Sequence, residues 1–169
     1  MRIELGARAD HCPCETKTIT PYVADEFPQG FREASCAVKV LSEERTFWEK
    51  ATILHAEFHR PPDKAMPERF SRHYCDFYDL IRKGVSKSAT AKPDLLAQVA
   101  EHKALFFKSS WARYGEAASG TLRVAPPELR LKALREDYAK MLRMFFGQTP
   151  GFGRMIDTLK EWETEFNQK

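Results

Sequence analysis

Residues 72–79 bring together side chains that bind phosphate, bind metal ions or move protons. They include Arg72, His73, Cys75, Asp76 and Asp79. At 3.6 residues per turn, Arg72, Asp76 and Asp79 fall on one line of a helix. A line of mixed charges is usually a solvated helix face whose ion pairs contribute about 0.3–0.5 kcal/mol each. The residue types alone therefore do not distinguish a site from an ordinary surface.

Lys50 is the residue that we expect to face Asp76. Pro61 and Pro62 end the helix before the short segment 59–67, and a second helix follows it, which predicts an antiparallel helical hairpin. Lys50 lies nine residues before this segment and Asp76 nine residues after it. At about 1.5 Å per residue, both then lie roughly 13–14 Å from the turn. The spacing predicts an ion pair at the edge of the helix seam, and a structural pair is the first interpretation.

The chain from Ser42 onward predicts a bundle of about five helices, each with one apolar face. The apolar stripes are Phe47, Ala51, Leu54 and Phe58; Phe70, Tyr74, Phe77 and Ile81; Leu96, Ala100 and Phe107; Leu134, Tyr138, Met141 and Phe145; and Met155, Leu159, Trp162 and Phe166. The segment 84–92 predicts a small polar loop that begins with a helix-capping Gly84. The segment 109–127, rich in Gly, Ser and Pro, predicts a long connection held by its aromatic residues.

The first 40 residues differ from this helical part. Apolar and polar residues alternate in RIELGAR (2–8) and in ASCAVKV (34–40), which is typical of strands with one buried face. Two or three strands rarely form a stable sheet by themselves. We therefore predict an α+β, mainly α fold with a β-rich part at 1–41 and a helical domain at 42–169.

Composition restricts the class of protein. The 169 residues have a formal net charge of +3, which permits a nucleic-acid or nucleotide partner without requiring one. There is no run of about 18 apolar residues and no apolar signal-peptide core, so we expect a cytoplasmic protein without a membrane span. The cysteines at 12, 14, 36 and 75 are interpreted as reduced thiols, because a structural zinc site usually has two separated ligand pairs.

Several long segments resemble one protein family. They are VLSEERTFWEKATILHAEFHR (40–60), RFSRHYCDFYDL (69–80), the stretch from His102 to Glu128, and FFGQTPGF (145–152). Together with RIELGAR, they make nearly the whole chain similar to the AbiEii/AbiGii toxin family of polymerase-β-like nucleotidyltransferases. The resemblance implies transfer of a nucleotidyl group from a nucleoside triphosphate, with Mg²⁺, in a toxin–antitoxin or abortive-infection system that defends against phage. It also implies a cognate antitoxin and, as in some members, tRNA as the acceptor.

The resemblance also implies roles for individual residues. Lys50 matches the lysine of the family's third motif, near the triphosphate, and Asp76 matches the essential aspartate of the fourth motif. Arg72 and Arg45 lie in the same motifs and are expected to bind substrate. Glu4 matches the acidic residue of the second motif and is expected to be catalytic and to bind metal. These roles suit phosphoryl-type transfer, which depends mainly on neutralising charge.

The family's first motif, Gly-Ser followed by paired acidic residues, has no counterpart in this sequence, which contains no Gly-Ser dipeptide. A two-metal site usually needs more than one carboxylate. We therefore expect the chain to be the C-terminal portion of a longer protein, with residues 1–41 forming the edge of the palm. The isolated chain is expected to be inactive.

Two further possibilities follow from the sequence. The chain could be a non-catalytic helical module that binds RNA or a protein partner through basic residues of the fourth helix, at 130, 132, 135, 140 and 143. Mixed charges at such spacing are more often a solvated face. An exposed palm edge would also favour self-association, because unpaired strand edges pair with other chains.

Overall fold

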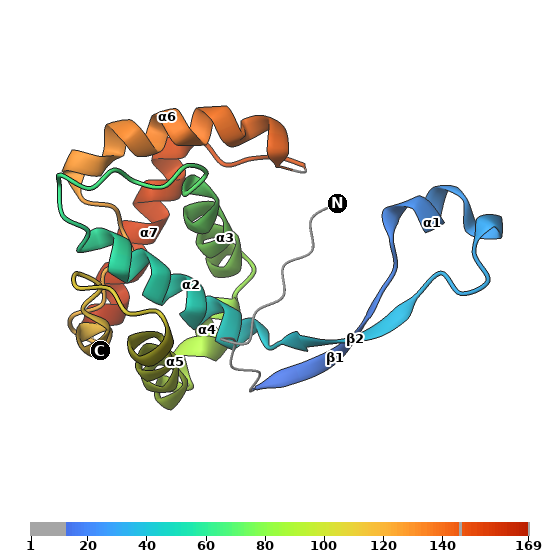
Figure 1. Ribbon diagram of the computed structural model, residues 1–169, viewed down its shortest axis with the longest axis horizontal. Coiled ribbons are helices and arrows are strands. Elements are labelled where there is room, and N and C mark those ends of the chain that lie inside the picture. The colour runs from blue at the N-terminus through green and yellow to red at the C-terminus, as the bar shows by residue number, and fades with distance from the viewer. Residues whose placement is uncertain (1–12, 146, 169) are drawn as a thin grey trace. The chain divides into compact units, whose positions relative to one another are not determined.

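The computed structural model describes residues 13–145 and 147–168. The chain divides into two compact units, residues 1–42 and 43–169 (Figure 1). Within the described residues, the first unit contains a two-stranded sheet and the second is helical, so the fold is α+β and mainly α, as predicted. No helix in the described part of the chain is long and apolar enough to cross a bilayer.

The first unit is built on an antiparallel hairpin of β1 (Cys14–Ile19) and β2 (Cys36–Leu41), separated by α1 (Tyr22–Glu26) and the 3₁₀ turn η1 (Pro28–Gly30). Cys14 pairs with Leu41, and Ile19 pairs with Cys36. The two cysteines therefore lie at opposite ends of the hairpin, roughly 17 Å apart at about 3.4 Å per residue. Neither a disulfide nor a metal ion can join them across that distance. The predicted strand at 2–8 and Cys12 lie outside the described residues.

Apolar side chains of this unit face solvent. Tyr22 is 80% exposed and Phe27 is 61% exposed, whereas Ala24 is buried. A two-stranded ribbon with so little buried apolar surface is marginal by itself. The assignment of this unit to a palm edge, and self-association through it, stay predictions.

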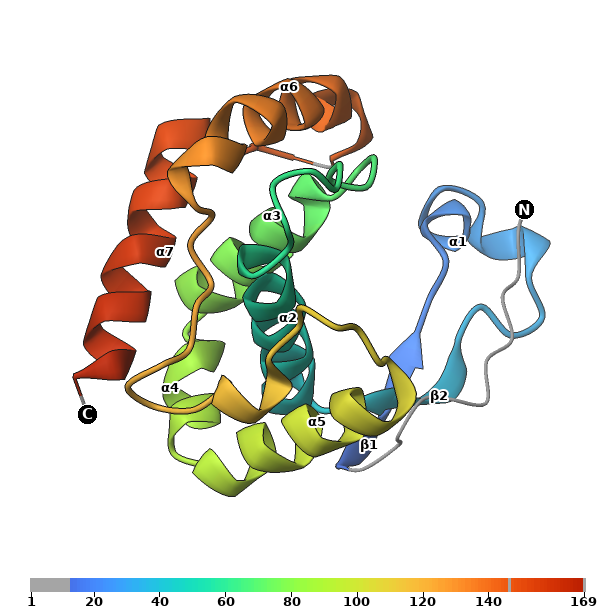
Figure 2. The same cartoon turned by 60° about the vertical axis from the view of Figure 1, so that its left-hand side comes forward.

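In the second unit, α2 (Glu43–Phe58) lies in the middle and packs against α3 (Ser71–Arg82), α4 (Val85–Thr90) and α5 (Pro93–Phe106), as Figure 1 and Figure 2 show. The chain continues through the 3₁₀ turns η2 (Tyr114–Glu116) and η3 (Glu128–Arg130), α6 (Leu131–Met141), the 3₁₀ turn η4 (Leu142–Met144) and α7 (Phe152–Asn167). The predicted stripes form one core, apart from Phe58, Met141 and Phe107, the last of which follows the end of α5 and is 41% exposed. At its centre the rings of Phe47 and Phe77 lie 4.6 Å apart, and Trp162 stacks on Phe166 at 5.1 Å.

The segment predicted as a polar loop, 84–92, contains the helix α4. Gly84 ends α3 in the left-handed region, at φ +81°, as predicted for a cap. Val85 and Ala89, four residues apart, are both buried, and the carbonyl of Ala89 accepts a hydrogen bond from the indole of Trp48 at 3.2 Å. The loop prediction was wrong because so short a helix is stabilised by tertiary packing, which its small polar residues do not reveal.

The long connection between α5 and α6, residues 107–127, is held by two buried polar side chains. The Nδ1 atom of His55 accepts the backbone N–H of Arg123 at 3.0 Å, and its Nε2–H donates to the carbonyl of Arg113 at 3.1 Å. The Glu163 carboxylate accepts the backbone N–H groups of Val124 and Ala125 at 2.5 and 2.8 Å. The connection therefore satisfies its buried backbone groups without forming a regular element.

Side chains around α6 hold the hairpin of α2 and α3 in place. Asp137 accepts the backbone N–H groups of Arg69 and Ser71 at 2.6 and 2.8 Å, which caps the start of α3. Arg130 donates to the carbonyls of Pro61 and Lys64 at 2.6 and 2.8 Å and is buried. Arg130 is therefore occupied in the α2–α3 connection and does not belong to an exposed basic face. The fourth helix also ends at Met141, earlier than predicted.

Candidate functional site

Lys50 and Asp76 meet across the seam between α2 and α3. Their Nζ and Oδ2 atoms are 2.5 Å apart, which confirms the contact expected from the spacing of the hairpin. The side chain of Lys50 is 21% exposed and that of Asp76 is 46% exposed. A pair so open to solvent contributes about 1 kcal/mol or less to folding. An anionic ligand can therefore compete with Asp76 for the ammonium group at little cost in stability.

His73 is the second group at the lysine. Its Nδ1 atom lies 3.4 Å from Nζ of Lys50, a long hydrogen bond in which Nδ1 must be the acceptor because an ammonium only donates. Burial lowers the pKa of His73 to about 4, with help from the positive charges of Lys50 and Arg72. The ring is therefore neutral at pH 7. His73 and Asp76 hold the ammonium group of Lys50 from two directions.

A second ion pair links α2 to α5 next to Lys50. The Nζ atom of Lys103 lies 2.5 Å from Oε2 of Glu49, and a guanidinium nitrogen of Arg45 lies 3.4 Å from Oε1 of the same carboxylate. The Lys103 side chain is only 9% exposed, and its ammonium group stands 4.5 Å above the ring of Phe107. The charge of Lys103 contributes to lowering the pKa of His73, so the two ion pairs are neighbours. We call these residues, together with His73, the Lys50–Asp76 cluster. Its cations, Arg45, Lys50 and Lys103, outnumber its carboxylates, Glu49 and Asp76, and this excess of positive charge favours an anionic ligand.

The other predicted site residues are placed differently. Arg72 is exposed, one turn before Asp76 in α3. Arg45 is fully buried and contacts Glu49 of the cluster. Glu4 lies outside the described residues. The roles of these three residues, like those of Lys50 and Asp76, stay predictions.

No site role was predicted for His73, Glu49 or Lys103, although His73 belongs to the chemically capable residues of 72–79. The available signal for Lys103 was its place on the apolar stripe of α5, three residues after Ala100 and four before Phe107. A lysine on such a stripe needs a buried partner. Glu49 and His73 gave no comparable signal, because their contacts depend on how α3 and α5 pack on α2.

The described residues do not form a magnesium site. No group of three His, Cys, Asp or Glu side chains in the described part of the chain is arranged to hold a metal ion. Asp76 and Glu49, the carboxylates of the cluster, are each engaged by a lysine, Asp76 by Lys50 and Glu49 by Lys103. Mg²⁺ would have to displace both lysines to reach these two carboxylates. It normally takes six oxygen ligands, more than the two carboxylates supply.

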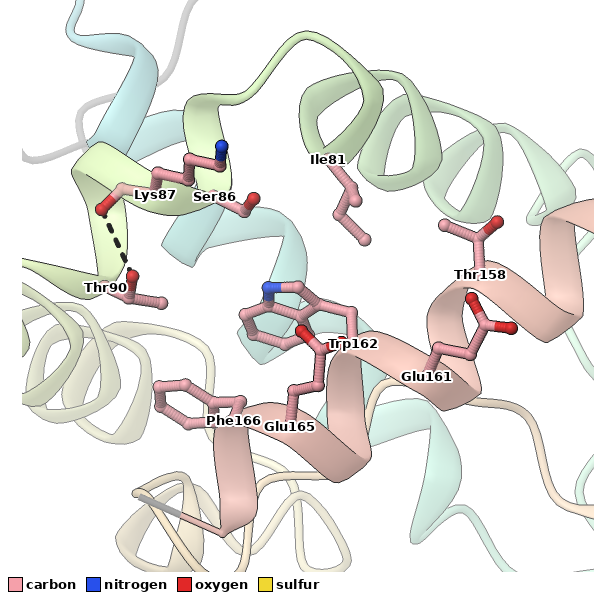
Figure 3. Close-up of a pocket in the computed structure, with 9 residues that line it drawn as sticks. All are labelled: Ile81, Ser86, Lys87, Thr90, Thr158, Glu161, Trp162, Glu165 and Phe166. Atoms are coloured by element: carbon pink, nitrogen blue, oxygen red, sulfur yellow. Dashed lines mark hydrogen bonds between the residues drawn. The ribbon is translucent and has the colours of Figure 1, made fainter.

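A cavity of about 360 Å³ between α3, α4 and α7 has a different character. Trp162 and Phe166 line it together with the carboxylates of Glu161 and Glu165, and Lys87 lies across from them (Figure 3). None of the residues of the Lys50–Asp76 cluster lines this cavity. Its two carboxylates make it unsuitable for phosphate.

Comparison with known proteins gives one match. A sequence model of the family described as "Nucleotidyl transferase AbiEii toxin, Type IV TA system" matches residues 1–164. No curated protein and no solved structure matches the chain. The matched range includes the first unit, nearly all of the second unit and the whole Lys50–Asp76 cluster.

Proposed function

The chain belongs to the AbiEii family of nucleotidyl transferase toxins of type IV toxin–antitoxin systems, and we propose that Lys50 and Asp76 form part of its nucleotidyl-transfer site. The observation that supports this most is the contact of 2.5 Å between the two residues. They come from separate helices, and the cluster around them has an excess of positive charge. Family membership also implies an antitoxin that opposes the toxin.

In nucleotidyl transfer, a nucleophile of the acceptor attacks the α-phosphorus of the triphosphate, and pyrophosphate leaves. Negative charge then develops on the phosphoryl oxygens, so that positioned cations supply much of the catalysis. We assign this role to Lys50, a compact point charge, with Lys103 as a second cation nearby. Asp76 and neutral His73 orient the Lys50 ammonium group, and exposed Arg72 is available to the substrate.

Members of the family are expected to use a metal ion as well as the triphosphate. The described residues do not fit Mg²⁺, so we assign no step to it here. Glu4 is the residue that we propose as an acidic metal ligand. The 169 residues contain no Gly-Ser dipeptide followed by paired acids, and we propose that they transfer nothing detectable without such a segment.

The acceptor that we propose is an RNA of the tRNA class, in a system that acts against phage. The proposal is tested with an α-labelled triphosphate, Mg²⁺ and total RNA. We expect no labelled RNA with the 169 residues alone, and labelled RNA when a segment with the Gly-Ser and acidic-pair motif is joined upstream.

Matched variants of this joined protein test whether transfer depends on Lys50 and Asp76 in particular or on any charged residue of α3. Lys50→Ala and Asp76→Ala should each remove transfer, while Asp79→Ala, an exposed aspartate one turn further along α3, should keep it. Transfer at the native rate in Lys50→Ala would show that the site lies elsewhere.

A second candidate function is RNA binding without transfer. Lys132, Arg135, Lys140 and Arg143 are exposed on α6 and η4, although Glu136 lies among them. Binding through these cations should weaken steeply with salt. Equal affinity at low and high salt would remove this candidate.

A further inference from the structure

A cavity of about 410 Å³ lies where α5 ends and the connection to α6 begins. Its polar lining comes from Lys108, Ser109, Ser110, Arg113 and Tyr114, and Gly115 contributes backbone. These side chains offer an ammonium group, a guanidinium group and three hydroxyls, and no carboxylate of the described residues is among them. Such a lining is complementary to a phosphate group, which presents only acceptors.

Two features make this cavity more than a flat basic surface. The Oγ atom of Ser109 is buried and has no hydrogen-bond partner among the described residues. A buried hydroxyl normally has a partner, and a ligand in the cavity could supply it. Arg113 adopts the left-handed region at φ +46°, and its carbonyl is held by the buried ring of His55. The backbone that presents the guanidinium group is thus fixed from α2.

The carboxylate that competes with a phosphate for Arg113 is held only weakly. Glu116 lies 3.6 Å from Arg113, and the two side chains are 54% and 58% exposed. Solvent screens a pair so exposed, so a ligand phosphate can replace the carboxylate. Lys108 has no ion pair within the described part of the chain.

The cavity adjoins the Lys50–Asp76 cluster through Tyr114. Tyr114 lies in η2, which packs against α2 and α5, the helices that carry Glu49 and Lys103. Glu49 in turn holds Lys103.

We propose that this cavity is a phosphate-binding subsite, with Lys108, Arg113 and Ser109 as its ligands. The phosphate can belong to a nucleic-acid backbone or to a nucleoside triphosphate, which share the same chemistry. The proposal deepens the proposed function, because it places a substrate phosphate beside the transfer site. It does not depend on transfer, since the cavity can bind phosphate in an inactive protein.

The test measures equilibrium binding to the full chain. The probes are a fluorescein-labelled 20-nucleotide single-stranded RNA and a fluorescent ATP analogue, each at 50 and 200 mM KCl. The variants are Lys108→Gln, Arg113→Gln and the double variant, with Ser109→Ala to remove the proposed hydroxyl ligand. Lys87→Gln, an exposed lysine of α4 that lines the acidic cavity of Figure 3, is the control.

We expect the double variant to lose about tenfold in affinity at 50 mM salt. The slope of log K against log salt should fall by about 0.7 for each phosphate that the variant no longer neutralises. Weaker binding of RNA alone assigns the subsite to a nucleic-acid backbone, and weaker binding of ATP alone assigns it to the triphosphate. Native affinity for both probes in the double variant overturns the proposal, as does an equally large decrease in Lys87→Gln.

Failure of the subsite and failure of the proposed function are distinguishable. If Lys108 and Arg113 are irrelevant to binding while Lys50→Ala still abolishes transfer in the joined protein, only the subsite is wrong. Thermal melting of each variant shows whether the fold is intact. Lys108→Glu reverses an exposed charge and should weaken binding more than Lys108→Gln does. If Arg113→Gln unfolds, this comparison tests the subsite without any change at Arg113.

Discussion

The ammonium nitrogen of Lys50 lies 2.5 Å from a carboxylate oxygen of Asp76, although 26 residues separate them in the chain. Both residues stand level in the hairpin of α2 and α3, and both remain partly open to solvent. His73 contacts the same ammonium group from the α3 side. The contacts with Asp76 and His73 therefore orient the Lys50 ammonium group and leave it accessible to a ligand.

Breaking the Lys50–Asp76 pair should change stability little. We expect Lys50→Met and Asp76→Asn each to lower the free energy of unfolding by about 1 kcal/mol or less, since the pair is partly exposed and therefore screened by solvent. Urea denaturation of both variants and of the double variant measures the coupling, which should be about 0.2–1 kcal/mol. A coupling of several kcal/mol would indicate a structural pair instead.

Removing Glu163 should destabilise the second unit strongly. Glu163→Ala leaves the buried N–H groups of Val124 and Ala125 without their acceptor, at an expected loss of about 2–4 kcal/mol. Glu165→Ala, an exposed glutamate two residues further along α7, is the matched control and should change stability by about 0.5 kcal/mol or less. Equal effects of the two substitutions would contradict the role of Glu163 in holding the α5–α6 connection.

Acid should weaken the fold through His55. Burial lowers the pKa of this ring from 6.5 to about 4, and the ring is fully buried. Between these two pKa values the unfolded chain binds a proton that the folded chain does not, so stability falls as the pH falls from about 6.5 to about 4. The expected loss between pH 7 and pH 5 is about 2 kcal/mol for this group.

His73, whose pKa is also lowered to about 4, acts in the same direction. Urea denaturation at pH 7 and pH 5 measures the sum. In His55→Gln the loss of stability over this range should shrink by about the 2 kcal/mol assigned to His55, while His73 and His59, whose pKa burial also lowers, still contribute. An unchanged dependence would show that the ring of His55 is protonated in the folded protein.

Local pattern was sufficient to predict much of the second unit. The five predicted helices are present, with α2 and α3 in the predicted hairpin, because apolar spacing and two adjacent prolines determine both. The contact between Lys50 and Asp76 could be predicted because both residues lie nine positions from the short segment 59–67. These inferences needed no knowledge of how distant elements pack.

The remaining parts depend on distant packing. The contact of Lys103 with Glu49 requires the position of α5 on α2, and α4 forms because Val85 and Ala89 find a buried environment. His55 and Glu163 both lie on apolar stripes of their helices, where a polar residue signals a buried hydrogen bond, but their partners lie in a connection that has no regular pattern. Glu4 lies outside the described residues, so its assignment still rests on resemblance.

The most direct test of the site exchanges its two charges. Lys50→Asp combined with Asp76→Lys restores the ion pair and, by urea denaturation, should restore native stability. If Lys50 binds the triphosphate from α2, label transfer from an α-labelled triphosphate by the joined protein should stay absent in the exchanged variant. Transfer restored to the native rate would contradict the account, because it would show that only the ion pair itself matters.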